Sequence, residues 1–99
     1  MEDRPEYPLD IVINNKKLSR VVIDQHYKIN HPEMNDKLIV ELVRTQDGAI
    51  LNIEEEKDGF QYFSIEPVEY EEKPYRLILL LCIHDDFVGV VNAFRVRRK

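Results

Sequence analysis

The chain has 99 residues, of which 43% are hydrophobic and 33% are charged, and its formal net charge is −5. This balance is typical of one folded domain and excludes a disordered chain. The longest apolar run, residues 77–83, is too short to cross a bilayer, and the acidic N-terminus lacks the apolar segment of a signal peptide. We therefore expect a cytoplasmic protein with no membrane partner.

Acidic residues are concentrated in one stretch. Residues 54–73 contain eight acidic residues and two lysines, a net charge of −6, whereas the chain ends in Arg95-Val-Arg-Arg-Lys99. A strongly acidic protein is a poor platform for extended nucleic acid, because such binding depends on neutralising phosphates. A small basic pocket and a basic protein partner are both compatible with this charge pattern.

The N-terminal part of the chain predicts an arm followed by a hairpin. Residues 1–8, with two prolines and four charges, are expected to form a flexible arm. Residues 9–13 and 18–23 are predicted strands. Asn14-Asn15 between them suits a tight turn, since asparagine tolerates a left-handed backbone.

Two helices are expected next. Asp24 is a suitable N-cap for a short helix, which ends at His31 because Pro32 disfavours helix at the residue before it. A second helix begins near Asn35 and has one apolar face, and Gly48 suits the left-handed residue that follows a helix.

From residue 49 onward the pattern is strand and turn. Residues 49–56 and 60–68 flank Asp58-Gly59, a strong hairpin turn. Pro67 is expected at an edge or a bulge, because proline cannot donate to the sheet.

A last hairpin is predicted from residues 75–83 and 87–96, around Asp85-Asp86. Both strands are apolar on both faces, so we expect them at the centre of the sheet. The pattern as a whole predicts a single α+β domain over residues 9–99, in the order ββααββββ. We expect an antiparallel sheet of about four to six strands, with both helices packed on one face.

This hairpin is expected to bring two arginines together. If the two-residue turn sets the register, Arg76 lies directly opposite Arg95. Two facing guanidinium groups repel unless an anion lies between them, and arginine binds phosphate oxygens through two parallel hydrogen bonds. The alternative is that each arginine pairs with a nearby carboxylate such as Glu69, Glu71 or Glu72.

A second cluster contains His26, Lys28, His31 and Glu33. Histidine is the natural acid or base near neutral pH, and the lysine is a candidate to bind phosphate. In the alternative interpretation His26 packs beneath the helix and His31 caps its end. The two histidines are five residues apart and do not share one helical face, so no metal site is expected.

Asn92 interrupts an apolar strand, and a buried amide needs a hydrogen bond to a ligand, a histidine or the backbone. Aromatic side chains are candidates to stack on a nucleobase, although such residues more often belong to the core or the sheet surface. They are Phe60, Tyr62, Phe63, Tyr70 and Tyr75.

Five segments carry a resemblance to a known family. They are Ile23-Asp-Gln-His-Tyr27, His31-Pro-Glu33, Leu38-Ile-Val-Glu-Leu-Val43, Tyr75-Arg-Leu-Ile78 and Gly89-Val-Val-Asn-Ala-Phe-Arg95. Together they resemble small nucleases of the barnase–EndoU–colicin–RelE superfold, and most closely RelE-like and BrnT-like toxin domains and their phage-associated relatives.

The resemblance implies cleavage of RNA by attack of the 2′-hydroxyl, without a metal or other cofactor. It makes His26 the general base or acid and His31 an assisting or structural residue, with Arg76 and Arg95 holding the phosphate. We expect further substrate contacts from Lys28, Tyr62 and Asn92. A toxin of this type would have an antitoxin-like protein partner that neutralises it.

The chain departs from this family in two respects. It is acidic where RelE-like toxins are usually basic, and its last strand has Asn92-Ala-Phe94 where they more often have a Thr/Ser-Ala-Tyr-like segment. A second hypothesis is therefore a non-enzymatic protein-binding domain on the same fold, which uses its acidic surface at residues 54–73. A third is a small-molecule pocket between helix and sheet.

Overall fold

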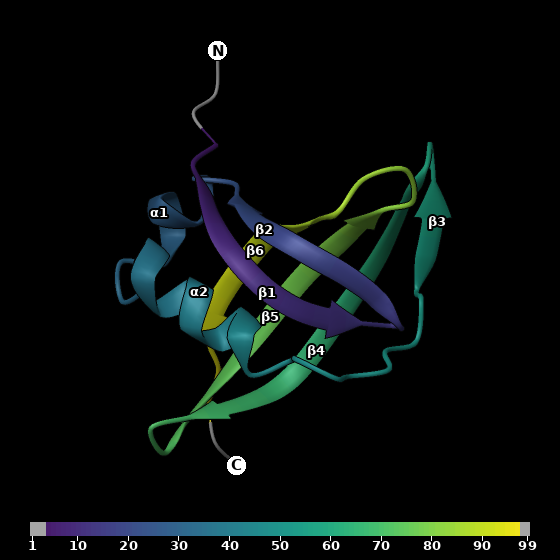
Figure 1. Ribbon diagram of the computed structural model, residues 1–99. Helices are drawn as coiled ribbons and strands as arrows, with labels where there is room; N and C mark the ends of the chain where they lie inside the picture. The colour runs from purple at the N-terminus through teal and green to yellow at the C-terminus, as the bar shows by residue number, and fades with distance from the viewer. Residues whose placement is uncertain (1–3, 98–99) are drawn as a thin grey trace.

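Six strands of the computed structural model form one mixed sheet, with two helices beside it (Figure 1). The structure describes residues 4–97. In chain order the elements are β1 (Glu6–Ile13), β2 (Lys16–Ile23), α1 (Tyr27–Asn30), α2 (Asp36–Arg44), β3 (Glu55–Lys57), β4 (Phe60–Tyr70), β5 (Lys73–Cys82) and β6 (Phe87–Arg95). The predicted α+β class is confirmed, and neither described helix is long and apolar enough to cross a membrane.

The strand order in the sheet is β1-β2-β6-β5-β4-β3, so β5 and β6 are central, as their apolar faces predict. Neighbouring strands run antiparallel except β2 and β6, which are parallel. The prediction of an antiparallel sheet is wrong at this pair. The chain leaves β2 through both helices and pairs with it again only after β3, β4 and β5, and so long a crossover permits a parallel neighbour.

The core lies on the inner face of the sheet, which curls so that β1 and β2 cross over β4 and β5 (Figure 1). Side chains alternate between the two faces of a strand, and in β5 the buried ones are Leu77, Leu79 and Leu81. α2 adds Ile39 and Leu42 to the same cluster. Burial of each of these side chains stabilises the fold by about 1.5–3 kcal/mol.

The start of α2 agrees with the prediction. Asn35 caps the helix, and its side-chain oxygen accepts a hydrogen bond from the backbone N–H of Leu38 at 2.8 Å. α1 is shorter than predicted, because it begins at Tyr27. The Asp24 carboxylate does not cap this helix and instead accepts the backbone N–H of His26 at 2.8 Å.

The predicted strand at residues 49–56 forms only at its end, as β3, and residues 50–54 are irregular. The reason is a pair of hydrogen bonds to the backbone of Leu51. Asn14 Oδ1 accepts the Leu51 N–H at 2.6 Å, and Asn14 Nδ2 donates to the Leu51 carbonyl at 3.1 Å. These bonds occupy backbone groups that a neighbouring strand would need.

Two predicted hairpin turns are confirmed. Asn14 and Asn15 have φ of 53° and 64°, and Asp58-Gly59 has φ of 53° and 83°. Pro67 lies at a register shift of β4, which confirms the expected bulge. β1 begins at Glu6, inside the segment expected to form an arm, and residues 1–3 lie outside the described part of the chain.

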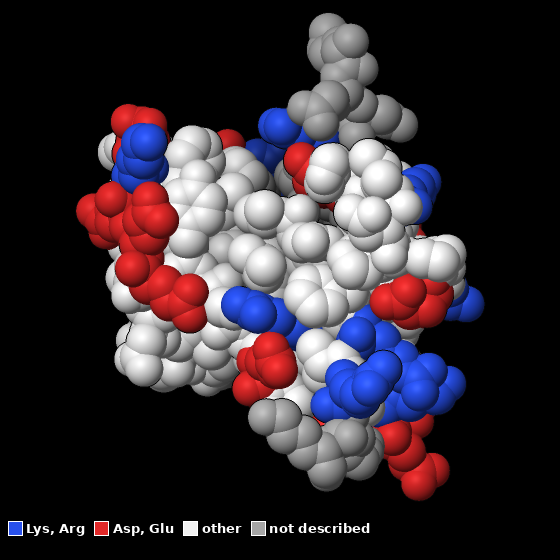
Figure 2. Space-filling view, turned by 180° about the vertical axis from the view of Figure 1, so that it is seen from behind, with Lys and Arg blue, Asp and Glu red and all other residues white. Residues whose placement is uncertain are grey.

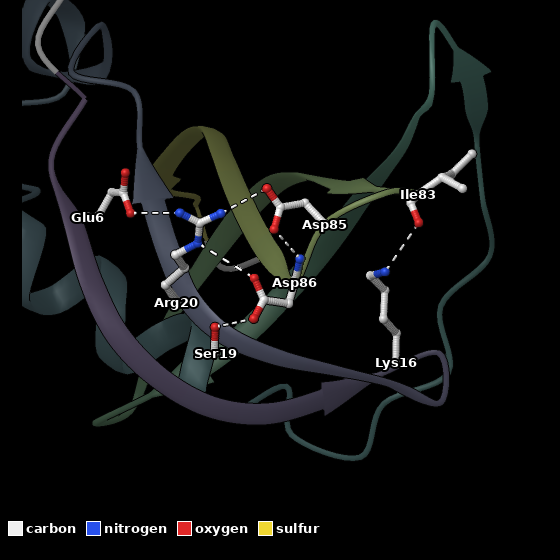
Figure 3. A network of polar contacts seen from close by, with 7 residues as sticks. All are labelled: Glu6, Lys16, Ser19, Arg20, Ile83, Asp85 and Asp86. Carbon is white, nitrogen blue, oxygen red and sulfur yellow. Dashed lines mark hydrogen bonds and ion pairs between the residues drawn. The ribbon is translucent and has the colours of Figure 1, made fainter.

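A network of polar contacts joins the β5–β6 loop, residues 83–86, to the β1–β2 hairpin (Figure 3). Arg20 on β2 contacts Glu6 at 3.0 Å and Asp85 at 2.9 Å. The hydrogen bond to Glu6 is the main cause that raises the pKa of Arg20, and Asp85 adds to it against the opposing effect of burial. The Arg20 guanidinium also lies 5.2 Å from the ring centroid of Phe87, so the network positions the start of β6.

Candidate functional site

The predicted pairing of Arg76 with Arg95 is wrong. β5 and β6 are joined by residues 83–86 and not by a two-residue turn, and a bulge further along β6 shifts the register again. As a result Arg76 lies opposite Phe94, and Arg95 lies opposite Tyr75. Because successive residues of a strand point to opposite faces, the two guanidinium groups lie on opposite faces of the sheet.

The outer face of the sheet carries a row of apolar side chains across β4, β5, β6 and β2. Tyr62 lies opposite Leu80, and Leu80 lies opposite Gly89. Gly89 in turn lies opposite Val22. Tyr62, Leu80 and Val22 are half-buried and alternate with buried residues of their strands, so the row faces away from the core. Gly89 is buried because the Leu80 side chain lies over it. Figure 2, which views the molecule from behind, shows a broad surface here that is mostly uncharged.

A hollow of about 360 Å³ opens on this face. Leu80 and Gly89 both line it, and a Cβ on residue 89 would lie only 2.8 Å from Leu80 Cδ1. Glycine therefore allows the leucine side chain to lie across β6. Three aromatic rings and one ion pair are also part of the lining: Phe60, Tyr62 and Phe87, and Arg4 with Asp24.

The arginines that border this face are already paired with carboxylates. Arg4 Nε lies 3.8 Å from Asp24, and Arg20 is held in the network of Figure 3. Arg76 Nε lies 3.7 Å from Glu66 and donates a hydrogen bond to the hydroxyl of Ser64 on β4. Arg76 therefore pairs with a carboxylate, which is the alternative considered from the sequence. The partner is Glu66 and not Glu69, Glu71 or Glu72.

Glu55 and Glu56 of β3 form an acidic edge of the sheet beside the hollow. Glu55 lies opposite Tyr62, so both side chains are on the outer face. Glu56 lies opposite Gln61, which donates a hydrogen bond to it at 3.1 Å on the other face. Two adjacent glutamates therefore differ in whether they reach the hollow side of the sheet.

Several residues predicted to form a site share the outer face. They are His31, Arg76, Tyr62 and Asn92. His31 joins this face because its ring stacks on Phe94, with the centroids 4.7 Å apart and the planes at 16°. Asn92 Oδ1 accepts the backbone N–H of Ala93 at 2.9 Å, which is the backbone alternative for this amide.

His26, which immediately precedes α1, and Lys28, which lies on α1, are apart from that group, and both are exposed. The exposure of His26 contradicts the alternative in which it packs beneath the helix. Its side chain makes no capping hydrogen bond, and its backbone N–H binds Asp24, which lines the outer hollow. His26 is thus linked to the hollow through its backbone.

Arg95 borders a second hollow, of about 400 Å³, between α2 and the β4–β5 hairpin. Glu33 Oε2 accepts the backbone N–H of Arg95 at 3.2 Å and lies 3.9 Å from His31 Nδ1. Lys37 and Lys73 line the same hollow. No pattern in the sequence marks it, because its residues come from α2, a hairpin and the end of β6, which are distant along the chain.

A half-buried carboxylate, Asp36, joins α2 to α1 and β1. Asp36 accepts hydrogen bonds from the hydroxyls of Tyr7 and Tyr27, both at 2.6 Å, and from Gln25. Burial raises the pKa of Asp36, but the hydrogen bonds from Tyr27, Tyr7 and Gln25 outweigh it and hold the pKa below its usual value. Burial first, and then the bond to Asp36, raise the pKa of Tyr27. All three partners are accounted for within the fold, so this cluster is structural.

Residues 4–97 contain no group of three or more His, Cys, Asp or Glu side chains placed to hold a metal ion. No family model, curated protein or solved structure matches the chain. Two geometric features bear on function. They are the aromatic-lined hollow on the outer face and the polar hollow beside Arg95.

Proposed function

We propose that this chain is a protein-binding domain that receives an apolar side chain of its partner in the hollow on the outer face. The observation that carries the proposal is the aromatic-lined hollow of about 360 Å³ on the side of the sheet opposite the core. Val91 at its rim is 37% exposed. Contiguous apolar surface of this kind on a folded domain commonly marks an interaction site.

A protein segment fits this face better than a nucleic acid does. RNA binding depends on cations that neutralise phosphates, and Arg4, Arg20 and Arg76 each already contact a carboxylate. Glu55 lies beside Tyr62, where the acidic edge begins. The proposed partner segment therefore combines an apolar anchor with lysine or arginine residues that meet this edge.

Apolar contacts in the hollow provide most of the binding free energy, and the acidic edge provides selectivity between partners. Burial of one large apolar side chain contributes about 1.5–3 kcal/mol. An aromatic anchor against Phe60, Tyr62 or Phe87 adds about 0.5–1.5 kcal/mol. Charge complementarity mainly increases the association rate and excludes wrong partners. We therefore expect a transient complex whose association slows as salt concentration rises.

Selection of displayed random peptides on the immobilised domain tests this function. Enriched peptides should carry an aromatic or large aliphatic residue close to Lys or Arg. Calorimetry should show that Tyr62→Ala weakens their binding by about tenfold or more. Tyr70→Ala is the matched control, because Tyr70 is a half-buried tyrosine of the same strand that lines the other hollow. Peptides that bind wild type and Tyr62→Ala equally well would overturn the proposal.

A second proposed function is metal-independent cleavage of RNA, the activity implied by the resemblance to RelE-like and BrnT-like toxins. The observation that favours it is the Glu33 carboxylate, which lies next to the His31 imidazole and accepts the Arg95 backbone N–H. In this function His31 takes the proton of the attacking 2′-hydroxyl, the bond from phosphorus to the 5′-oxygen breaks, and the protonated imidazole returns the proton to that leaving oxygen. Glu33 orients the imidazole, and Arg95 neutralises the phosphate. Its biological partner would be a neutralising protein.

Incubation with mixed cellular RNA in EDTA separates the two functions. The enzymatic function requires cleavage by wild type that is lost in His31→Ala or His26→Ala, with an unchanged thermal midpoint. His84→Ala is the control, because His84 is an exposed histidine in the β5–β6 loop. An intact RNA pool after incubation with the folded wild type would contradict this second function and leave the first untouched.

A further inference from the structure

The arginines at positions 4 to 95 differ in whether they contact a carboxylate. Arg4, Arg20, Arg44 and Arg76 each contact a carboxylate, as is expected in a chain with an excess of acidic residues. The guanidinium of Arg95 contacts no carboxylate in the part of the chain that the structure describes, although three glutamates line the same hollow. Among the described residues, the positive charge of Arg95 therefore lacks a carboxylate contact, and Arg97, two residues further on, lacks one as well.

Two lysines share this hollow with Arg95. Lys37 comes from the first turn of α2, and Lys73 comes from the start of β5. Among residues 4–97 neither ammonium group contacts a carboxylate. Figure 2 shows a group of Lys and Arg side chains beside the C-terminal end of the chain, in contrast to the acidic edge on the opposite side. Three elements thus supply cations to one hollow.

Two of the three glutamates in the lining are engaged elsewhere. Glu33 accepts the Arg95 backbone N–H and lies near His31, and Glu41 pairs with Arg44 at 3.2 Å. A backbone hydrogen bond leaves the charge of Glu33 in place, so Glu33 and Glu71 offset two of the three cations. With Glu41 paired to Arg44, the described lining keeps a net charge of +1. The N-terminus of α2 adds to it, because the aligned peptide dipoles of a helix are positive at that end.

We infer that this hollow binds the phosphate group of a small phosphorylated ligand. A dianionic phosphate matches an arginine fork and two ammonium groups better than a singly charged carboxylate does. Asn35 lines the hollow and uses only its oxygen in capping α2, so its amide N–H groups are available to donate. Tyr70 also lines the hollow. The site does not depend on the function proposed for the outer face.

The position of the arginine is fixed by the fold. Its backbone N–H is held by Glu33, and its strand partner Tyr75 is 5% exposed and packs in the core. Lys73 begins the strand that contains Tyr75. Two of the three cations therefore come from paired strands, which reduces the ordering cost of binding.

Titration of the ¹⁵N-labelled protein with inorganic phosphate tests the site. Amide shifts should map to residues around Lys37, Lys73 and Arg95, with a dissociation constant on the order of 1 mM. Arg95→Gln should weaken binding by about tenfold. Arg76→Gln is the matched control, because Arg76 is one residue from the strand partner of Arg95 but lies on the opposite face and is already paired.

A gain of affinity provides a second test that does not depend on a lost contact. Glu71→Gln removes a carboxylate of the lining that has no hydrogen bond or ion pair within residues 4–97, so it should tighten phosphate binding by about threefold to tenfold. Unchanged affinity in both Arg95→Gln and Glu71→Gln, or shifts that map to the outer face, would overturn the inference.

Two ligands that carry the same phosphate group distinguish its source. O-phosphoserine and adenosine monophosphate are titrated under the same conditions, with serine and adenosine as controls. Tighter binding of the nucleotide would indicate stacking of the base on a tyrosine of the hollow, and tighter binding of phosphoserine would indicate a modified peptide. Binding of phosphate without any cleavage of RNA would support the site and contradict the second proposed function.

Discussion

Gly89 and Leu80 lie opposite each other on β6 and β5, and the leucine side chain occupies the space that a Cβ on residue 89 would need. The distance from that Cβ position to Leu80 Cδ1 is 2.8 Å, shorter than an ordinary contact between carbon atoms. Gly89 does not have a positive φ, unlike Gly48 and Gly59. The requirement for glycine here is therefore one of space and not of backbone conformation.

Gly89→Ala should destabilise the fold by about 1–3 kcal/mol, because the added carbon forces Leu80 to move. Leu80 lines the hollow, so its displacement should weaken peptide binding as well. Urea unfolding measures the first effect and calorimetry the second. The double variant Leu80→Ala/Gly89→Ala is the control. If Gly89→Ala lowers the free energy of unfolding by the same amount in the Leu80→Ala background as in wild type, the steric explanation is wrong.

The β4–β5 turn is made by an unusual pair of residues. Glu71 and Glu72 have φ of 49° and 67°, in the left-handed region where turns of this kind prefer Asn and Gly. Glu71→Asn with Glu72→Gly should raise the free energy of unfolding by about 0.5–2 kcal/mol, because the new residues tolerate this backbone. Chemical denaturation measures the change. A decrease would show that contacts of the glutamates outweigh the backbone strain.

Local patterns predict two hairpin turns and the cap of α2, but they miss the start of α1 and the long-range strand pairing. Asn35 and Asp58-Gly59 act within their own segments, so residue type and spacing are sufficient to find them. The parallel neighbours β2 and β6 are far apart in sequence, and no local signal reports their pairing. The same holds for Asn14, whose bonds to Leu51 replace a predicted strand.

The candidate site depends most on register, which is the least predictable quantity. The longer β5–β6 loop and the bulge in β6 together move Arg76 by one position relative to Arg95. A shift of one residue exchanges the two faces of a strand, so Arg76 and Arg95 lie on opposite faces instead of facing each other as predicted. The polar hollow beside Arg95 could not be predicted, because its residues meet only in the folded chain.

Asp36 should make the protein sensitive to acid. Its folded pKa lies below its unfolded value, so its bonds stabilise the fold above the unfolded pKa of about 3.9 and are lost as the pH falls through the folded pKa. Asp36→Asn should cost about 1–2 kcal/mol at neutral pH, because two charge-assisted hydrogen bonds weaken. Urea unfolding of both proteins as a function of pH measures the difference.

The difference between wild type and Asp36→Asn should shrink in acid, since the carboxylate becomes neutral in wild type too. Asp10→Asn, which alters an exposed carboxylate of β1, should show no such change. A constant difference down to about pH 2 would contradict the assignment.

Tyr27 should determine the alkaline limit of stability. Its folded pKa is raised above the unfolded value of about 10, so its contribution is complete below that pH and is lost as the pH rises toward the folded pKa. Tyr27→Phe removes the ionisable hydroxyl and should flatten the loss of stability above about pH 10. Thermal unfolding across the alkaline range measures this, and Tyr62→Phe serves as the control on the outer face. An equally steep loss in Tyr27→Phe would assign the alkaline limit to other groups.

Arg20 should control the order of the β5–β6 loop more than global stability. Its contacts to Glu6 and Asp85 join β1, β2 and the loop, but they are exposed and screened by salt (Figure 3). Arg20→Met keeps most of the apolar stem over Phe87 and removes the charge, so amide exchange in residues 83–86 should accelerate while the unfolding midpoint changes little. Arg44→Met, which breaks a pair within α2, should leave loop exchange unchanged. If high salt and Arg20→Met both fail to accelerate exchange, the loop is held by its backbone bond between Ser19 and Asp86 and not by the arginine.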